Sequence, residues 1–514
     1  MNFARLSMLA LLAWTAAGIC WLVVLALRVG YPFHLEWLES HVFCQALRFA
    51  QGFPLFEDAA AGLPAHPYGP LYYLVCGGLL RFLEPSLLVC RGISQLATIL
   101  VAATAWALAR RSGASARTAW LAPLAWLAFF PACGAWYDLA RVDLLGLALW
   151  FVGVLCVRDA ARGDRRWWSA VALFTLAGLA KQSCLPLACW SWLARARARE
   201  LGSSLLGAGL SSIASLALYL GLDQLLDGRL LYYAWELPGS HPQALAHAAL
   251  LFLLPALPLA LVGVAAALVA RARREELALL LHWLGAALLC SWTITKQGAF
   301  LNHYLPLAAL GAVLVPLALE ALVNAEIARA RRALAGIALL ASGVLCIVAS
   351  SPREQVPTAA DRAAGERWLA WLKESRVEVR MPAFTYLPVL AGWPVRAHEM
   401  AAVEVFDDWS RRLADRHGAA ESARVMAQQP DLAGLLRGEP TAFVLAEDGS
   451  GGTGLSFFAP LLTAPGAASA LGTWSYPDKT VFRARTGNPV RPSSLWVAPA
   501  SASLALPPLP ALSR

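Results

Sequence analysis

Residues 6–28 read LSMLALLAWTAAGICWLVVLALR, and the only charge in this stretch is its last residue, Arg28. A helix needs about 20 apolar residues to cross the hydrocarbon core of a bilayer, so the segment predicts a transmembrane helix. Similar apolar runs follow at 87–109, 117–133, 139–157, 167–180, 183–194, 202–222, 244–270, 277–294, 300–322 and 333–350. We therefore expect a mainly α-helical, polytopic membrane protein with about eleven transmembrane helices.

The composition of the chain excludes several classes of protein. Of its 514 residues, 59% are hydrophobic and 15% are charged, whereas soluble domains carry about a quarter charged residues. The net charge of +9 would suit a nucleic-acid-binding protein, but the basic excess lies in the hydrophobic part. Residues 1–350 hold 25 Lys and Arg against 17 Asp and Glu, and residues 351–514 hold 17 against 16. We expect a membrane protein with a polar C-terminal domain and no nucleic-acid partner.

Arginine clusters predict the orientation of the chain, because cytoplasmic loops retain Lys and Arg. Every second connector between the apolar runs is basic. With Arg5, these connectors hold Arg110, Arg111, Arg117, Arg158, Arg162, Arg165, Arg166, Arg195, Arg197, Arg199, Arg271, Arg273, Arg274, Arg329, Arg331 and Arg332. The N-terminus is then inside, with a retained first span, and residues 351–514 are outside. A shorter run at 70–83 would invert this pattern if it crossed, so we expect it to be interfacial or re-entrant.

Residues able to do chemistry gather in the connectors that this orientation places outside. In the first outer loop, Glu36 and Glu39 stand three positions apart and share one face of a helix. The apolar spacing that follows would lay this helix on the membrane surface, so a solvated acidic face is an equally good interpretation.

The second outer connector brings Asp138, Arg141 and Asp143 to the boundary of a span, where ionisable groups are costly. These three residues are either a neutralised structural cluster or a site that holds a phosphate or a metal ion.

Lys181 and Lys296 are the only lysines in residues 1–350, and each begins a Lys-Gln pair at an outer turn. A lysine at such a turn can simply anchor a helix end at the interface. Two outer lysines, one outer arginine and several carboxylates together suit a phosphate-bearing substrate dissolved in the membrane. The outer loop at 223–243 adds aromatic residues, which are typical of the interfacial belt and less often of a carbohydrate platform.

These patches resemble the bacterial polytopic glycosyltransferases of the GT-C class, which include the protein O-mannosyltransferases and the lipid A aminoarabinose transferase. In that class an acidic residue or pair after the first span is followed by a glycine turn and a Pro-Leu-Tyr-Tyr segment. Here Glu39 precedes Gly52, and residues 70–73 read PLYY. Residues 140–143, ARVD, are similar to the class's Ala-Arg-x-Asp pattern at the start of a span. One bacterial subgroup has outer turns similar to Lys181-Gln182 and Asn302-His303-Tyr304. Many members have Asp directly before the glutamate, where this chain has Leu38.

The resemblance implies an inverting transfer of a sugar from a polyprenyl-phosphate donor to a lipid, polysaccharide or protein acceptor. The reaction would take place on the periplasmic face of a bacterial inner membrane. Glu39 would be the base that activates the acceptor hydroxyl, with Glu36 and Asp143 as alternatives. The residues expected to bind the substrates are Asp138, Arg141, Lys181, Lys296, His66, Tyr72, Asn302, His303 and Tyr304. No cofactor is implied with certainty, since the carboxylates suit a divalent cation but Arg and Lys can replace one.

Two other functions stay open at this stage. A transporter or flippase of lipid-linked sugars would carry charges at mid-span and a trace of internal repeats, whereas this sequence has its charges at the outer rim. A non-catalytic membrane scaffold that displays the C-terminal domain would have no need of paired outer carboxylates.

The composition divides the chain into three parts. Residues 1–350 are the predicted transmembrane catalytic domain. In residues 351–485, an amphipathic helix at 363–374 alternates with short apolar runs, which predicts a small extracytoplasmic α/β domain that covers the outer cavity or binds the acceptor. Residues 486–514 are rich in Pro, Ser and Ala and are expected to form a loosely ordered tail.

Overall fold

The computed structural model describes residues 3–418 with short breaks, and a few stretches beyond. The breaks are 59–62, 196–199, 271–273, 297, 324–325, 376–378, 382 and 397, and the further stretches are 442–445, 469–473, 482, 484–485 and 494–497. The chain forms two compact units. The first joins Met1–Val29, Gly92–Leu220 and His241–Arg353, and the second joins Gly30–Arg91, Gly221–Ser240 and Glu354–Arg514. The boundary at Arg353 lies close to the predicted one at 350, but residues 30–91 and 221–240 cluster with the C-terminal segment.

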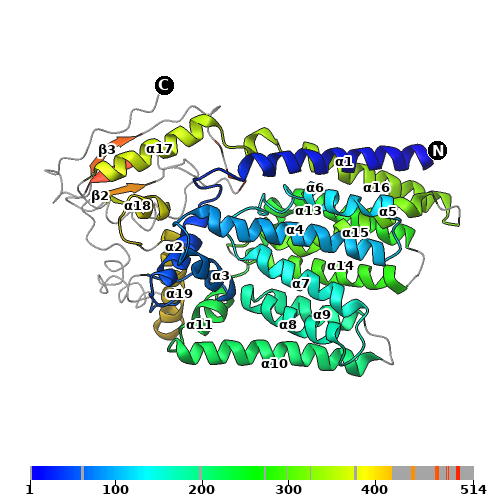
Figure 1. Cartoon of the computed structure of the whole chain (residues 1–514), viewed down its shortest axis with the longest axis horizontal. Coiled ribbons are helices and arrows are strands. Elements are labelled where there is room, and N and C mark those ends of the chain that lie inside the picture. Colours follow the sequence, from blue (N-terminus) through cyan, green and yellow to red (C-terminus); the bar gives the residue numbers. More distant parts are fainter. Residues whose placement is uncertain are drawn as a thin grey trace. The chain divides into compact units, whose positions relative to one another are not determined.

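The first unit is a bundle of helices whose long members lie side by side in Figure 1. The helices of this unit, long and short, are α1 (Phe3–Arg28), α4 (Leu87–Arg111), α5 (Ala116–Ala119), α6 (Leu121–Ala128), α7 (Asp143–Arg158), α8 (Arg165–Ala180), α9 (Cys184–Ala194), α10 (Leu201–Leu225), α13 (Leu245–Val269), α14 (Arg274–Thr293), η4 (Leu301–Tyr304), α15 (Leu305–Leu322) and α16 (Arg329–Val348). Among the described residues, six helices are long and apolar enough to cross a membrane. A mainly α-helical, polytopic membrane protein is therefore confirmed, while the count of eleven spans stays a prediction.

Tryptophans and small residues pack α1 into this bundle. The indole nitrogens of Trp14 and Trp21 donate to the carbonyls of Leu339 (3.1 Å) and Cys346 (2.7 Å) on α16. A Cβ atom on Gly18 would lie only 2.6 Å from the Leu124 carbonyl of α6. Because lipid supplies no hydrophobic force between helices, close approaches and hydrogen bonds of this kind hold the helices together.

The apolar run at 117–133 folds differently from a single span. It forms the short helices α5 and α6 and ends in a turn, where Gly134 and Ala135 have φ values of 72° and 61°. Residues 136–142 then lead into α7, whose first residue is Asp143. Tyr137 then stacks on Trp126 with ring centroids 4.0 Å apart, which fixes the connector that carries Asp138 and Arg141.

The second unit combines short helices with a small sheet. Its helices are α2 (Glu39–Ala50), α3 (Leu71–Leu80), α11 (Arg229–Leu231), the π-helix η3 (Tyr232–Glu236), α12 (Leu237–Gly239), η5 (Arg353–Gln355, which spans the unit boundary), α17 (Ala359–Glu374), α18 (Tyr386–Leu390) and α19 (Glu399–His417). Helix α3 covers most of the run at 70–83, and its ten residues reach about 15 Å, too short to cross a bilayer.

The strands of the second unit are β1 (Val379–Arg380), β2 (Ala442–Leu445), β3 (Ser469–Thr473) and β4 (Ser494–Val497). Their order in the sheet is β1-β2-β4-β3, with β1 parallel to β2 and the other pairs antiparallel. Strand β4 lies within the segment that was predicted to be a loosely ordered tail. Its residues 494–497 (SLWV) include Leu, Trp and Val, which favour a strand, and they pair with both β2 and β3. The rest of that tail, residues 486–493 and 498–514, lies outside the described residues.

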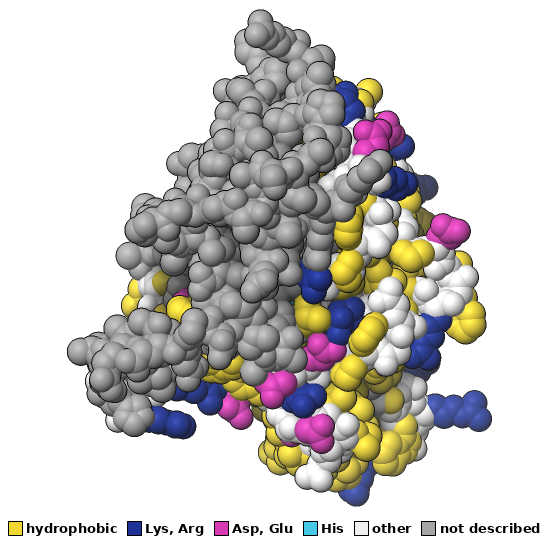
Figure 2. Space-filling model, turned by 90° about the vertical axis from the view of Figure 1, so that its left-hand side faces the viewer, with side chains coloured by type: hydrophobic (Ala, Val, Ile, Leu, Met, Phe, Trp, Pro, Cys, Tyr) yellow, Lys and Arg dark blue, Asp and Glu magenta, His cyan; other side chains and the backbone are white. Residues whose placement is uncertain are grey.

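The described surface carries charges of both signs. On the face drawn in Figure 2, basic and acidic side chains are interspersed with apolar ones and do not merge into one basic patch.

Candidate active site

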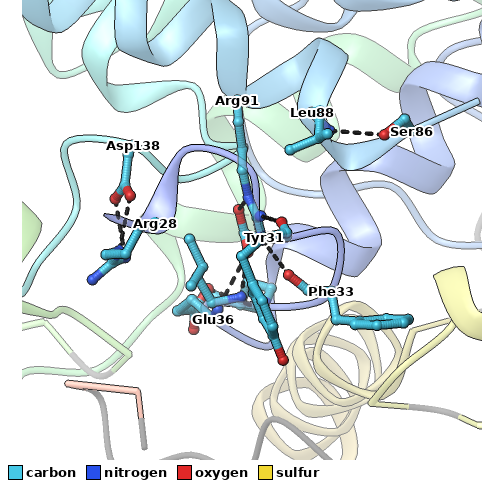
Figure 3. Close-up of polar contacts among 11 residues, drawn as sticks. Arg28, Tyr31, Phe33, Glu36, Ser86, Leu88, Arg91 and Asp138 are labelled. Atoms are coloured by element: carbon cyan, nitrogen blue, oxygen red, sulfur yellow. Dashed lines mark hydrogen bonds and ion pairs between the residues drawn. The ribbon is translucent and has the colours of Figure 1, made fainter. Parts of the chain in front are cut away.

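In the second unit, one arginine organises the loop at residues 31–39. Arg91, near the start of α4, forms a bidentate ion pair with Glu39, at 2.7 Å from Nε to Oε1 and 2.6 Å from Nη2 to Oε2. The same guanidinium donates to the carbonyls of Tyr31 (2.5 Å) and Phe33 (2.6 Å), as Figure 3 shows for the labelled partners. We call Arg91, Glu39 and these two carbonyls the Arg91 clamp. It closes residues 31–39 around a single buried cation.

Glu39 is more fully engaged than an acidic residue on a solvated helix face would be. Its Oε2 also accepts the backbone N–H groups of Leu35 (2.8 Å) and Glu36 (3.3 Å). The Glu39 side chain is 0% exposed and that of Arg91 is 1% exposed. As the first residue of α2, the carboxylate is also stabilised by the helix N-terminus. The solvated-face interpretation therefore does not apply to Glu39.

Glu36 lies in the loop just before α2 and is 2% exposed. Its Oε2 accepts the backbone N–H of Leu38 at 3.0 Å. Glu36 is thus buried close to Glu39, on the loop that leads into α2.

The C-terminal segment of the second unit docks on this loop. Ser40 Oγ lies 3.1 Å from Thr385 Oγ1 and accepts the backbone N–H of Tyr386 at 2.9 Å. The His34 ring packs against that of Tyr386 with centroids 4.0 Å apart. His34 is 1% exposed and, among the described residues, neither of its ring nitrogens has a hydrogen-bond partner. Burial, together with the charge of Arg91, lowers the pKa of His34 well below its usual value.

In the first unit, polar residues from three connectors converge on Asp143. The Lys181 ammonium and the Asn302 amide (2.7 Å) both donate to Oδ1, and the Trp136 indole donates to Oδ2 at 3.1 Å. The Arg141 Nε lies 3.8 Å from Oδ2. We call these five residues the Asp143 cluster. Of the residues predicted from sequence to form a site, it brings together Arg141, Asp143, Lys181 and Asn302.

The local structure explains why these side chains meet. Asp143 is the first residue of α7, where a carboxylate is favoured by the helix N-terminus. Lys181 follows the last residue of α8, and Asn302 lies in η4. A Cβ atom on Gly146 would be 3.2 Å from the Cβ of Lys181, so a glycine one turn into α7 lets the lysine approach closely.

A small pocket of about 30 Å³ adjoins the Asp143 cluster. Its polar lining is Asp143, Lys181, Ser183, Asn302, His303 and Thr293, and the remaining walls are leucines, cysteines and a proline. With two cations and one carboxylate, the Asp143 cluster has a formal net charge of +1. A cluster with a net positive charge is suited to binding a phosphate group.

Asp138 has a different partner from the one expected. Arg28, the last residue of α1, holds it in a bidentate pair at 2.8 and 3.0 Å, and both side chains are buried (Figure 3). Asp138 therefore orients Arg28 at the end of the first span. Its predicted role of orienting Arg141, Lys181 or Lys296, or of binding the acceptor, stays a prediction.

The remaining predicted residues lie as follows. Lys296 donates to the carbonyl of His241 at 3.1 Å, His66 has its ring 4.7 Å from that of His41, and Tyr72 is fully buried and donates to the carbonyl of Cys90 at 2.8 Å. Tyr304 ends η4 and is 7% exposed. The described residues contain no group of three or more His, Cys, Asp or Glu side chains placed to hold a metal ion.

Sequence reasoning did not single out Arg91 or Arg28. Both are arginines within or at the end of an apolar run, where an ionisable group is costly unless it is paired. The presence of an arginine in or beside an apolar run is therefore the feature of the sequence from which a buried ion pair at Arg91 and Arg28 could have been predicted.

No model of a protein family matches the chain, and no curated protein matches it significantly. Two solved structures are similar to it over nearly their whole length. One is ArnT from Cupriavidus metallidurans in the apo state, with a TM-score of 0.55 and 14% identity, covering 98% of each chain. The other is ArnT from the same organism bound to undecaprenyl phosphate, with a TM-score of 0.55 and 15% identity, covering 98% of this chain and 99% of the other. The chain therefore has a GT-C glycosyltransferase fold, as the sequence resemblance implied.

Proposed function

We propose that this protein is a membrane glycosyltransferase that moves a sugar from a polyprenyl-phosphate donor to an acceptor of the cell envelope, with inversion at the anomeric carbon. The observation that carries the proposal is the Asp143 cluster: two cations and an amide around one buried carboxylate, with a small pocket lined by Lys181 and Asn302 beside it. The similar fold of ArnT, whose structure was solved bound to undecaprenyl phosphate, supports a lipid-phosphate ligand.

In this proposal the Asp143 cluster receives the phosphate of the donor. The departing polyprenyl phosphate gains negative charge, and Lys181 and Arg141 are the fixed cations that stabilise it. Asp143 holds both cations in place and stays ionised between them. Asn302 and His303 lie at the same pocket and would bond to phosphate or sugar oxygens.

The base that activates the acceptor hydroxyl is proposed to be Glu36. The sequence favoured Glu39, but both oxygens of that carboxylate already accept from a guanidinium, and one of them from two peptide N–H groups as well, so Glu39 would have to leave these bonds to reach an acceptor hydroxyl. Glu39 would instead position the loop through the Arg91 clamp. The assignment between Glu36, Glu39 and Asp143 is decided by the experiment below.

The proposed topology follows the arginine clusters, with the N-terminus in the cytoplasm of a bacterium and residues 351–514 in the periplasm. The donor and the acceptor would then meet at the outer face of the inner membrane. Lys296 and His66 are proposed to contact substrate only after a rearrangement, since the Lys296 ammonium donates to the His241 carbonyl and the His66 ring packs against those of His41 and Tyr68.

The experiment measures polyprenyl phosphate released from a panel of undecaprenyl-phosphate sugars by the protein in nanodiscs, with an envelope extract as acceptor. Glu36→Gln is expected to slow release by about 10²–10⁴-fold, the usual contribution of a general base. Glu84→Gln, an exposed glutamate of the same unit, is the matched control and should leave release unchanged.

Three results would change the proposal. Full activity of Glu36→Gln with loss in Glu39→Gln or Asp143→Asn would move the base to that residue. Movement of the donor across the bilayer without release of polyprenyl phosphate would favour a flippase. Loss of activity on chelation and its recovery with a divalent cation would add a metal to the mechanism.

A further inference from the structure

A cavity of about 90 Å³ lies in the first unit, among the ends of α4, α7, α9 and α14. Aliphatic side chains form part of its lining, and the polar ones belong to Arg158, Asp159, Arg195, Glu275 and His282. Helix α7 runs from Asp143 to Arg158, and its 16 residues span about 24 Å. The cavity therefore lies at the opposite end of α7 from the Asp143 cluster and is a separate site.

The size of this cavity suits a small polar ligand. One water needs about 10–15 Å³ of such a cavity, so there is room for roughly six to nine waters. A phosphate group with a two-carbon arm and an amine has about eight non-hydrogen atoms, and it fills a comparable space.

His282 lines the cavity and has a buried nitrogen that can accept a hydrogen bond. The residue is 5% exposed, and its Nδ1 lies 2.7 Å from the carbonyl oxygen of Ala278. Because a carbonyl oxygen only accepts, Nδ1 carries the proton of the neutral ring, and Nε2 has a lone pair. Nε2 is buried and has no hydrogen-bond partner among the described residues. Since such an atom is costly to leave unpaired, a ligand that donates an N–H or O–H is favoured beside it.

Two arginines bring positive charge to the cavity and are held in place by neutral oxygens. Arg195 donates to the carbonyls of Val157 (2.5 Å) and Ala160 (2.9 Å), and Arg158 donates to the hydroxyl of Ser112 (2.5 Å). The two arginine side chains are 7% and 17% exposed. Fixed and largely buried guanidinium groups are well suited to bind a phosphate group.

The carboxylates of the lining are more exposed than its arginines. Glu275 is exposed, and the Asp159 side chain, 42% exposed, pairs with Arg111 at 3.2 Å and more loosely with Arg158 at 3.7 Å. Two arginines and two carboxylates give the lining a formal net charge of zero. A ligand that carries one charge of each sign matches this lining. Its ammonium group would be attracted by the carboxylates and would supply the N–H donor for Nε2 of His282.

We propose that this cavity binds a phosphate ester that carries a primary ammonium group, the chemistry of a phosphoethanolamine unit, either as a lipid head group or as a free compound. The phosphate lies against Arg158 and Arg195, and the ammonium donates a hydrogen bond to Nε2 of His282. The two arginines, which the sequence marks as orientation signals, thereby gain a second role. The site does not depend on the proposed sugar transfer.

The test is native mass spectrometry of the purified protein in detergent, with lipids that share the same acyl chains. Their head groups are phosphoethanolamine, N,N-dimethylphosphoethanolamine, phosphocholine and phosphoglycerol. The dimethyl head group keeps one N–H and phosphocholine has none, so this pair separates the hydrogen bond from the bulk of the methyl groups. Free O-phosphoethanolamine and free phosphocholine are titrated separately.

We expect the phosphoethanolamine compound to bind at least about tenfold more tightly than the phosphocholine one, the effect of one hydrogen bond from a charged donor. The dimethyl lipid should bind about as tightly as the unmethylated one. Arg158→Gln should weaken binding by about tenfold or more, because a charge-assisted bond to the phosphate is lost. Arg162→Gln, an exposed arginine of the same connector outside the cavity, should leave binding unchanged. His282→Phe should remove the preference over phosphocholine.

Binding of the lipid alone would assign the site to a head group, and binding of the free compound alone would assign it to a soluble ligand; both results support the proposal. Equal binding of phosphocholine or phosphoglycerol, binding of none of the compounds, or an Arg158→Gln variant that matches Arg162→Gln would each overturn it. The comparison of head groups uses the unaltered protein, so it decides the matter even where His282→Phe does not fold.

Discussion

Replacing Arg91 by Met is expected to lower the free energy of unfolding by roughly 3–5 kcal/mol, the cost of leaving one partner of a buried ion pair without the other. Arg91 and Glu39 are 1% and 0% exposed and share two hydrogen bonds. The substitution leaves the Glu39 carboxylate in the interior without its arginine partner. The carbonyls of Tyr31 and Phe33 lose their donor as well, which adds to the cost.

The cost should depend on charge more than on volume. Arg91→Lys keeps the charge but cannot form the bidentate pair, so an intermediate loss is expected. Glu39→Gln combined with Arg91→Met removes both charges, and the double variant should be less destabilised than the sum of the two single variants.

The assay is equilibrium unfolding of the purified protein in mixed micelles, followed by tryptophan fluorescence. Arg81→Met is the control, because Arg81 is an exposed arginine of the same unit and should cost less than about 1 kcal/mol. If Arg91→Met costs no more than Arg81→Met, or if the double variant is additive, the Arg91 clamp does not hold the first loop.

Three further predictions concern other parts of the two units. Lys181→Met should reduce release of polyprenyl phosphate by about 10²-fold or more, because a fixed cation at the leaving group is lost, and normal turnover would remove the Asp143 cluster from the mechanism. The lowered pKa of His34 makes the protein less stable in acid: below about pH 6.5 the unfolded chain binds a proton that the folded state resists, so the free energy of unfolding falls as the pH drops, by at most about 1.4 kcal/mol per pH unit. His34→Phe should flatten this slope in unfolding curves measured between pH 7 and 5, and an unchanged slope would contradict the burial of the ring. Gly365→Ala should cost about 1–3 kcal/mol in the same unfolding assay, because the new Cβ atom would lie 2.4 Å from the Phe33 ring, and an unaltered stability would mean that α17 does not pack on the first loop.

The sequence predicted the parts of the fold that depend on local composition. Apolar runs as long as 6–28 identify membrane helices, because length and hydropathy alone decide whether a segment can cross. The parity of the arginine clusters excluded a crossing at 70–83, and α3 is indeed too short to span. The run at 117–133 was beyond this reasoning, since its break depends on the backbone of Gly134 and Ala135 and on the packing of Tyr137.

The sequence predicted the part of the candidate site whose residues lie in the connectors between the apolar runs. Arg141, Asp143, Lys181 and Asn302 come together as that pattern suggested. Pairs across long sequence separations were not predictable: Arg91 stands 52 positions from Glu39, and Arg28 stands 110 from Asp138. Composition says only that a buried arginine needs a partner, and it cannot say which carboxylate provides it.

The order in which the chain is made has a consequence for the second unit. Its first segment ends at Arg91, and its last begins at Glu354, about 260 residues later. At roughly 5–20 residues per second, a ribosome needs on the order of 13–50 s to make the intervening chain. Throughout that interval the partners of Ser40 and His34, which are Thr385 and Tyr386, have not yet been synthesised. Arg91 and Glu39 are both already part of the nascent chain and can pair. The clamp can therefore shape the first loop during biogenesis, long before the segment that completes the unit leaves the ribosome.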